Sequence, residues 1–217
     1  MLAQSSCKGA SMGRPLVSVI TPTWQRHDLL RETVENVRGQ TYPNLEHIVI
    51  SDGPDDELNA IVHRSMFDAA PTVPINFVEL GRNWSGDLRN FGVAPLTVGM
   101  LLARGDYQMW LCDDERMTPE HIERLVDLLE ATGVDFAYSK VRMHWKGQPP
   151  EQGWDIGNGT PSWGQITNFL YRTSLLSRGM PDWGGHPIDW TLVHSWMAAD
   201  ATWVFSDRVT ITHRADR

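Results

Sequence analysis

The segment PLVSVITPTWQRHDLLRETVENVRGQTYPNLEHIVISD, residues 15–52, predicts a strand, a helix and a second strand. Residues 15–23 and 45–52 are apolar and β-branched with few charges, as expected of strands that are buried on both faces. Between them, residues 26–40 carry Leu and Val at helical spacing. This order indicates two parallel strands that are joined by a right-handed helical crossover.

The same alternation continues to about residue 145. It implies an α/β fold with a mostly parallel central sheet flanked by helices, in which ligands gather at the carboxyl ends of the strands. Capping signals are clearest in the last helix of the series, where Thr118 is the expected cap and Gly133 the expected end. The further strands are expected at 75–80, 107–112 and 135–145, and the further helices at 55–67, 86–105 and 118–133.

Composition narrows the class of function. With 19 basic and 27 acidic residues the net charge is −8, which disfavours general binding to nucleic acid or to an anionic membrane. Cys7 and Cys112 form no disulfide framework, so we expect a reducing, cytoplasmic setting. Residues 1–14 lack the apolar centre of a signal peptide, and we expect a flexible leader. Because the chain is acidic, a polyanionic ligand would need a local source of positive charge, such as a metal ion.

Three adjacent carboxylates follow the strand expected at 107–112. Asp113, Asp114 and Glu115 end an apolar run, YQMWLC, and their charges repel one another. This arrangement predicts that a positive group lies close to them. A divalent cation is one such group, and the alternative is that all three carboxylates simply cap the next helix.

Four stretches resemble glycosyltransferase family 2. They are residues 15–56, GDLRNFGV at 86–93, GDYQMWLCDDERMTPEHIERL at 105–125, and IDWTLVHSW at 188–196. The resemblance implies the GT-A Rossmann-like fold and transfer of a sugar, with inversion, from a nucleotide-diphosphate donor to an acceptor hydroxyl. It also implies Mn²⁺ or Mg²⁺ between the acidic residues and the diphosphate.

The family's Asp-x-Asp pattern falls on Cys112, Asp113 and Asp114, so a Cys stands where the first Asp is usual. The resemblance makes Asp114 the direct metal ligand. Asp113 is expected either to bind the nucleotide or to support the groups that hold the metal, and Glu115 is expected to be a solvated carboxylate. It also suggests His213 as a second metal ligand, and a neutral imidazole suits Mn²⁺ better than Mg²⁺.

The nucleotide would be held by residues that follow the first two strands. Asp52 is expected to accept a hydrogen bond from the base, which favours UDP or dTDP because uracil and thymine have an N3–H donor. Guanine also has N–H donors, so a GDP donor stays open. Pro22 and Thr23 would contribute backbone atoms, and Arg89 would face the nucleotide or its phosphates.

Asp189, near the start of the helix expected at 188–199, is in the position of the family's general base, which must reach the acceptor hydroxyl. Ile188 replaces the usual Glu, and Asp155 and Asp182 are reserve candidates for the base. The alternative role of Asp189 is that of a helix cap.

The chain has ten Trp residues, and most follow residue 140 in a region rich in Gly and Pro. Trp163, Trp183 and Trp190 could stack on the donor sugar or the acceptor. We therefore divide one domain into a leader (1–14), a nucleotide-sugar-binding half (15–145) and an acceptor-binding and catalytic-base half (146–217). Two other functions stay open, a degenerate GT-A domain that binds without transfer and, less favoured, a nucleotidyltransferase.

Overall fold

The computed structural model describes residues 13–67, 73–86, 92–145, 147–161, 168–178 and 188–215. At 64–67, 150, 189–190 and 214–215 it describes the backbone alone. The strands are β1 Val17–Thr23, β2 Leu45–Ser51, β3 Ile75–Glu79, β4 Tyr107–Trp110, β5 Glu115–Met117, β6 Phe136–Trp145, β7 Trp154–Ile156, β8 Phe169–Arg172 and β9 Trp203–Ala215. The α-helices are α1 His27–Arg38, α2 Asp56–Phe67, α3 Val93–Leu102, α4 His121–Thr132 and α5 Ile188–Ala198.

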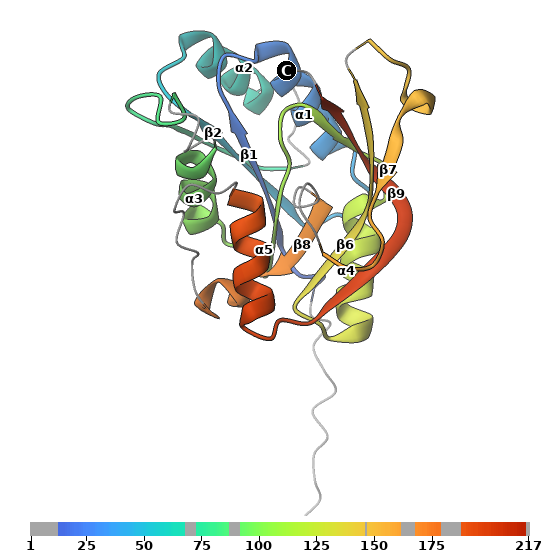
Figure 1. The fold of residues 1–217 in the computed structure, drawn as a ribbon. Helices are drawn as coiled ribbons and strands as arrows, with labels where there is room; N and C mark the ends of the chain where they lie inside the picture. The colour runs from blue at the N-terminus through green and yellow to red at the C-terminus, as the bar shows by residue number, and fades with distance from the viewer. Residues whose placement is uncertain are drawn as a thin grey trace, which may run out of the picture.

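One sheet contains all the described strands, in the order β3-β2-β1-β4-β8-β6-β9-β5, with β7 beside β6. β3, β2, β1 and β4 are parallel, as the alternating sequence predicts. β8 then lies antiparallel between β4 and β6, β9 is parallel to β6, and β5 is antiparallel to β9. The sheet is therefore Rossmann-like in its first half and mixed in its second, and it curls so that the long β9 bends around one side (Figure 1).

Helices cover both faces of the sheet. On one face α1 and α2 bury Leu30 and Leu58 against Val49 of β2, and α4 buries its apolar side over β1, β4 and β6. On the other face α3 and α5 pack around Ile20 and Trp196 in a second apolar cluster. Each of these contacts removes apolar surface from water, which is the main favourable term in folding.

Helix α3 lies unusually close to the sheet at one point. A Cβ atom at Gly99 would lie 2.3 Å from Cγ2 of Ile20, so only glycine lets the helix approach β1 this closely. Gly99 therefore has a packing role within the helix, which is shorter than the expected 86–105 and is present over Val93–Leu102.

The ends of the helices follow local signals only in part. α4 ends at Gly133, whose φ of 71° is the left-handed conformation that glycine favours. Its start differs from the expectation, because Glu120 and not Thr118 is the N-cap residue and no side chain caps it. None of the helices in the described ranges has both the length and the apolar character that a bilayer crossing requires.

The sheet brings distant segments together at one edge. β1 pairs in parallel with both β2 and β4, so Thr23, Ser51 and the residues after Trp110 end at the same edge. β5 pairs with β9 so that Glu115 lies opposite His213. This last pairing puts the end of the chain beside the acidic cluster.

Candidate active site

Asp113 is the buried centre of the acidic cluster. Its Oδ2 accepts a hydrogen bond from Thr23 Oγ1 (2.8 Å), and Oδ1 accepts one from Arg26 Nη1 (2.8 Å). Its backbone carbonyl accepts from Thr33 Oγ1 of α1 (3.1 Å). The end of β1, the start of α1 and the end of β4 are thus tied together at one residue.

Arg26 is the positive group that the carboxylates required. It follows β1 at the N-cap position of α1, and the same Nη1 also donates to Asp114 Oδ2 (3.2 Å). The Arg26 side chain is 36% exposed, so the guanidinium borders solvent. The sequence analysis did not single out Arg26. The signal was available, since residues that follow β1 in a parallel sheet lie next to those that follow β4.

Glu115 is not the solvated carboxylate that we expected. It is 1% exposed, its Oε2 accepts from the backbone N–H of Cys112 (2.9 Å), and its Oε1 lies 3.1 Å from His213 Nδ1. Burial of this carboxylate destabilises the fold much less than burial of an unpaired charge would, because both of its oxygens have hydrogen-bond partners.

His213 lies where the resemblance put it, beside the acidic cluster. Its Nδ1 is 3.9 Å from Asp114 Oδ1. When Nδ1–H donates to Glu115, the imidazole lone pair is on Nε2, which is the tautomer that a metal ligand needs. Glu115 therefore orients His213 and fixes its proton.

Burial changes the acid–base behaviour of two neighbouring groups. Burial raises the pKa of Asp113, and the charge of Arg26 and the hydrogen bond from Thr23 oppose that rise. Burial also raises the pKa of the Cys112 thiol, and the carboxylates of Glu115, Asp114 and Asp113 raise it further. Cys112 is therefore an uncharged thiol and a poor metal ligand in this structure.

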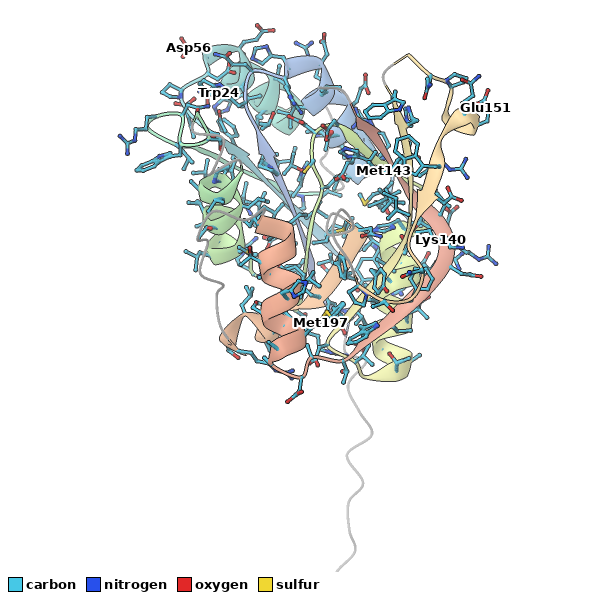
Figure 2. All side chains as sticks on the ribbon, viewed as in Figure 1. Trp24, Asp56, Lys140, Met143, Glu151 and Met197 are labelled. Carbon is cyan, nitrogen blue, oxygen red and sulfur yellow. The ribbon has the colours of Figure 1, made fainter. Side chains whose placement is uncertain are left out.

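Asp52, at the end of β2, is almost fully buried. Its two oxygens accept the backbone N–H groups of Trp84 (3.0 Å) and Ser85 (2.9 Å). A carboxylate offers about four lone-pair positions, so Asp52 retains the capacity to accept a further N–H from a base. The ring of Trp24, which follows Pro22 and Thr23 of β1 (Figure 2), packs against Gly53, where a Cβ atom would lie 2.6 Å from it. The Trp24 side chain thus lies beside the Asp52 turn, and the sequence analysis gave it no role.

Several of the expected site residues lie outside what the structure describes. Arg89, Trp163 and Trp183 are not among the described residues, and Asp189 and Trp190 are described by backbone alone, in the first turn of α5. Ile188 is buried in the apolar cluster under α5, which gives a packing reason for Ile at a position where Glu is usual. Asp155 is ion-paired with Arg142.

The described Trp residues divide into core and surface. Trp110 and Trp196 are buried in the core. Trp145 and Trp154 are exposed, and the centroids of their rings lie 5.6 Å apart. Strand register aligns Met143 of β6 with both Trp154 of β7 and His213 of β9. Residues aligned in this way point to the same face of a sheet.

Comparison with known proteins assigns the family. Residues 18–154 match the family model described as Glycosyl transferase family 2. The chain belongs to glycosyltransferase family 2. The match covers more than half of the chain and includes β1, the Asp52 turn and the acidic cluster.

Individual proteins resemble this glycosyltransferase in sequence or in fold. An uncharacterized glycosyltransferase of Rickettsia typhi is 29% identical over 115 residues, which are 53% of this chain and 32% of the relative. Residues 1–349 of S. aureus TarS, crystallised with UDP-GlcNAc, superpose with a TM-score of 0.70 at 17% identity, covering 93% of this chain and 59% of that one. A Pyrobaculum calidifontis mannosyltransferase, crystallised with GDP-Man and Mn²⁺, gives 0.66 at 18% identity, covering 93% and 57%. The chain spans about a third of the length of the Rickettsia typhi relative.

The acidic cluster of this glycosyltransferase contains few side chains that could bind a metal ion. Within the described ranges, no group of three or more His, Cys, Asp or Glu side chains is arranged to hold a metal ion. Asp114 and His213 are two side chains of ligand type that lie close together, with Oδ1 and Nδ1 3.9 Å apart. Mg²⁺ is commonly held by one or two carboxylates together with substrate phosphates, and Mn²⁺ also accepts imidazole. Two protein ligands therefore fit a cation that is completed by a nucleotide diphosphate.

Proposed function

We propose that this chain is an inverting, divalent-metal-dependent glycosyltransferase that moves a sugar from a UDP- or dTDP-linked donor to an acceptor hydroxyl. The observation that carries the proposal is that Asp114 and His213 lie side by side, with Asp114 Oδ1 3.9 Å from His213 Nδ1, at the edge where β1 and β2 also end, and that Nε2 of His213 keeps its lone pair for a cation. Side chains from distant parts of the sequence converge there, and buried Glu115 holds the imidazole in the required tautomer.

Each residue at this edge has a defined task in the proposal. Asp114 and His213 would hold Mn²⁺ or Mg²⁺, which neutralises the charge of the leaving diphosphate. Asp52 accepts an N–H from the base, and its buried, backbone-anchored carboxylate is already fixed in place. Pro22, Thr23 and Asp113 line the nucleotide. Positioning of the donor and stabilisation of the charge on its leaving diphosphate would supply most of the rate increase.

The second half of the chain provides the acceptor side of the proposal. Asp189, in the first turn of α5, takes the proton from the acceptor hydroxyl as that oxygen attacks the anomeric carbon. The diphosphate leaves from the opposite side, so the configuration inverts. Arg89 faces the phosphates, and Trp163, Trp183 and Trp190 stack on the donor sugar or the acceptor.

The nucleotide-sugar ligands of the TarS and Pyrobaculum structures support the donor class, and the Mn²⁺ of the latter supports the cation. One observation favours a second candidate, a domain that binds without transfer, because uncharged Cys112 stands where the family has an Asp.

Calorimetry with UDP and MnCl₂, followed by a donor-hydrolysis assay, separates the two functions. The transferase should bind UDP more tightly with Mn²⁺ and should slowly release UDP from a hydrolysable UDP-sugar. Metal-dependent binding without hydrolysis of UDP-glucose, UDP-galactose or their N-acetyl derivatives, and without transfer to any of a broad panel of acceptors, would instead favour the binding domain.

A further inference from the structure

Arg26 is paired with carboxylates that the proposed function uses. A single nitrogen, Nη1, donates to both Asp113 Oδ1 (2.8 Å) and Asp114 Oδ2 (3.2 Å). Asp113 and Asp114 are well buried, with side chains 5% and 15% exposed, whereas that of Arg26 is 36% exposed. The carboxylates are thus more buried than the guanidinium, which lies at the solvent border.

The Arg26 contact is not required to hold Asp113 in place. Thr23 Oγ1 donates to the other oxygen of Asp113, and both Thr33 and Arg116 donate to its backbone carbonyl. Loss of Arg26 would leave these hydrogen bonds intact. What Arg26 supplies is positive charge, which offsets the repulsion between the adjacent carboxylates of Asp113 and Asp114.

A divalent cation on Asp114 would meet this guanidinium at close range. Two positive charges a few ångströms apart repel strongly near a protein surface. While Arg26 is bound to Asp114, its positive charge also offsets the negative charge that would attract the metal ion. A diphosphate changes this balance, because a guanidinium has a planar fork of donors that matches phosphate oxygens. Arg26 also lines an open surface pocket next to the start of α1, so part of its side chain borders free space.

We infer that Arg26 is a resident counter-ion that occupies Asp113 and Asp114 in the free protein, gives way to the divalent cation, and turns to the diphosphate of the donor. This inference rests on the proposed function. The consequence is that the metal ion and the donor bind cooperatively. Each of them favours the conformation in which Arg26 has left Asp113 and Asp114 and contacts the diphosphate. Because binding free energies are linked, the factor by which UDP tightens Mn²⁺ must equal the factor by which Mn²⁺ tightens UDP.

The test measures Mn²⁺ binding without any catalytic assay. Free Mn²⁺ is followed by electron paramagnetic resonance during titration of the full chain, with and without saturating UDP. Arg26→Gln should bind Mn²⁺ alone about tenfold more tightly than the wild type, because the competing charge is gone. UDP should tighten Mn²⁺ binding by about 100-fold in the wild type, near the upper end of typical couplings, and by less than about tenfold in this variant.

Two further variants make the result specific. Arg26→Lys keeps a positive charge at the position, so its affinity for Mn²⁺ in the absence of UDP should stay close to that of the wild type. This variant also shows that substitution at position 26 does not by itself disturb the fold. Arg31→Gln, which removes an exposed arginine of α1 that pairs with Asp28, is the matched control and should change neither affinity.

Equal Mn²⁺ affinity of the wild type and Arg26→Gln, with the UDP coupling unchanged, would overturn the counter-ion role and leave the metal-dependent function standing. Weaker Mn²⁺ binding by Arg26→Gln would also overturn it. Failure of every variant to bind Mn²⁺, with or without UDP, would instead remove the proposed function and the counter-ion role together.

Discussion

Two buried histidines make the stability of this fold depend on pH. His121 is fully buried, and its Nδ1 lies 2.7 Å from Thr210 Oγ1, which itself donates to Ser139 Oγ (2.7 Å). Among the described residues, no group partners its Nε2. Burial lowers the pKa of His121 to about 3, and burial together with the charge of Arg38 lowers that of His47 to about 3. Protonation of either ring would leave a charge in an apolar interior.

The size of the effect follows from these values. In the unfolded chain each histidine takes up a proton as the pH falls below about 6.5, whereas in the folded chain it stays neutral down to about 3. Stability therefore decreases as the pH falls through this window. At about 1.4 kcal/mol per pH unit, each histidine should cost about 2 kcal/mol of unfolding free energy between pH 7 and pH 5.

Urea unfolding at pH 7 and pH 5 checks the prediction with His121→Asn and His47→Gln, which keep a neutral hydrogen-bonding group. Each variant should lose about 2 kcal/mol less stability than the wild type over this pH change, and the double variant about 4 kcal/mol less. The exposed His63→Gln is the control and should follow the wild type. Identical pH dependence in His121→Asn and the wild type would refute the reasoning.

The remaining predictions concern the site. Glu115→Gln should lower Mn²⁺ affinity in the presence of UDP about 10- to 100-fold, because the amide places an NH₂ donor at one of the two positions where Glu115 accepts from Cys112 N–H and His213. Calorimetry checks this, with exposed Glu35→Gln as control, and an unchanged affinity would remove the orienting role of Glu115. Asp189→Asn should leave UDP affinity nearly intact while transfer falls by orders of magnitude. Steady-state kinetics and UDP titration check this, and surviving transfer would mean that another residue is the base.

Much of the first half of the fold is predictable because its signals are local. The β-branched run before Pro22 and the apolar run before Asp52 are long enough to mark buried strands, and they form β1 and β2 in parallel register. The position of Asp52 at the end of β2 and of Asp113 and Asp114 at the end of β4 follows from the same pattern.

The second half depends on pairings that no local signal marks. β8 is four residues long and lies antiparallel between β4 and β6, and β5 is three residues long and pairs with the distant β9. Glu115 was taken for a solvated carboxylate because its burial depends on this pairing with His213. Arg26 differs from these cases, because its contact with Asp113 follows from the ends of β1 and β4 lying side by side in the expected parallel sheet.

The central claim is that a divalent cation joins Asp114 to the diphosphate of a nucleotide sugar. Calorimetric titration of UDP into the wild type and Asp114→Asn, each with MnCl₂ and with EDTA, tests it most directly, with the exposed Asp127→Asn as control. Mn²⁺ should tighten UDP binding about 100-fold in the wild type and the control, which is the factor by which UDP tightens Mn²⁺ binding, and should have little effect in Asp114→Asn. Equal UDP affinity with and without Mn²⁺ in the wild type, or full metal dependence in Asp114→Asn, would contradict the account.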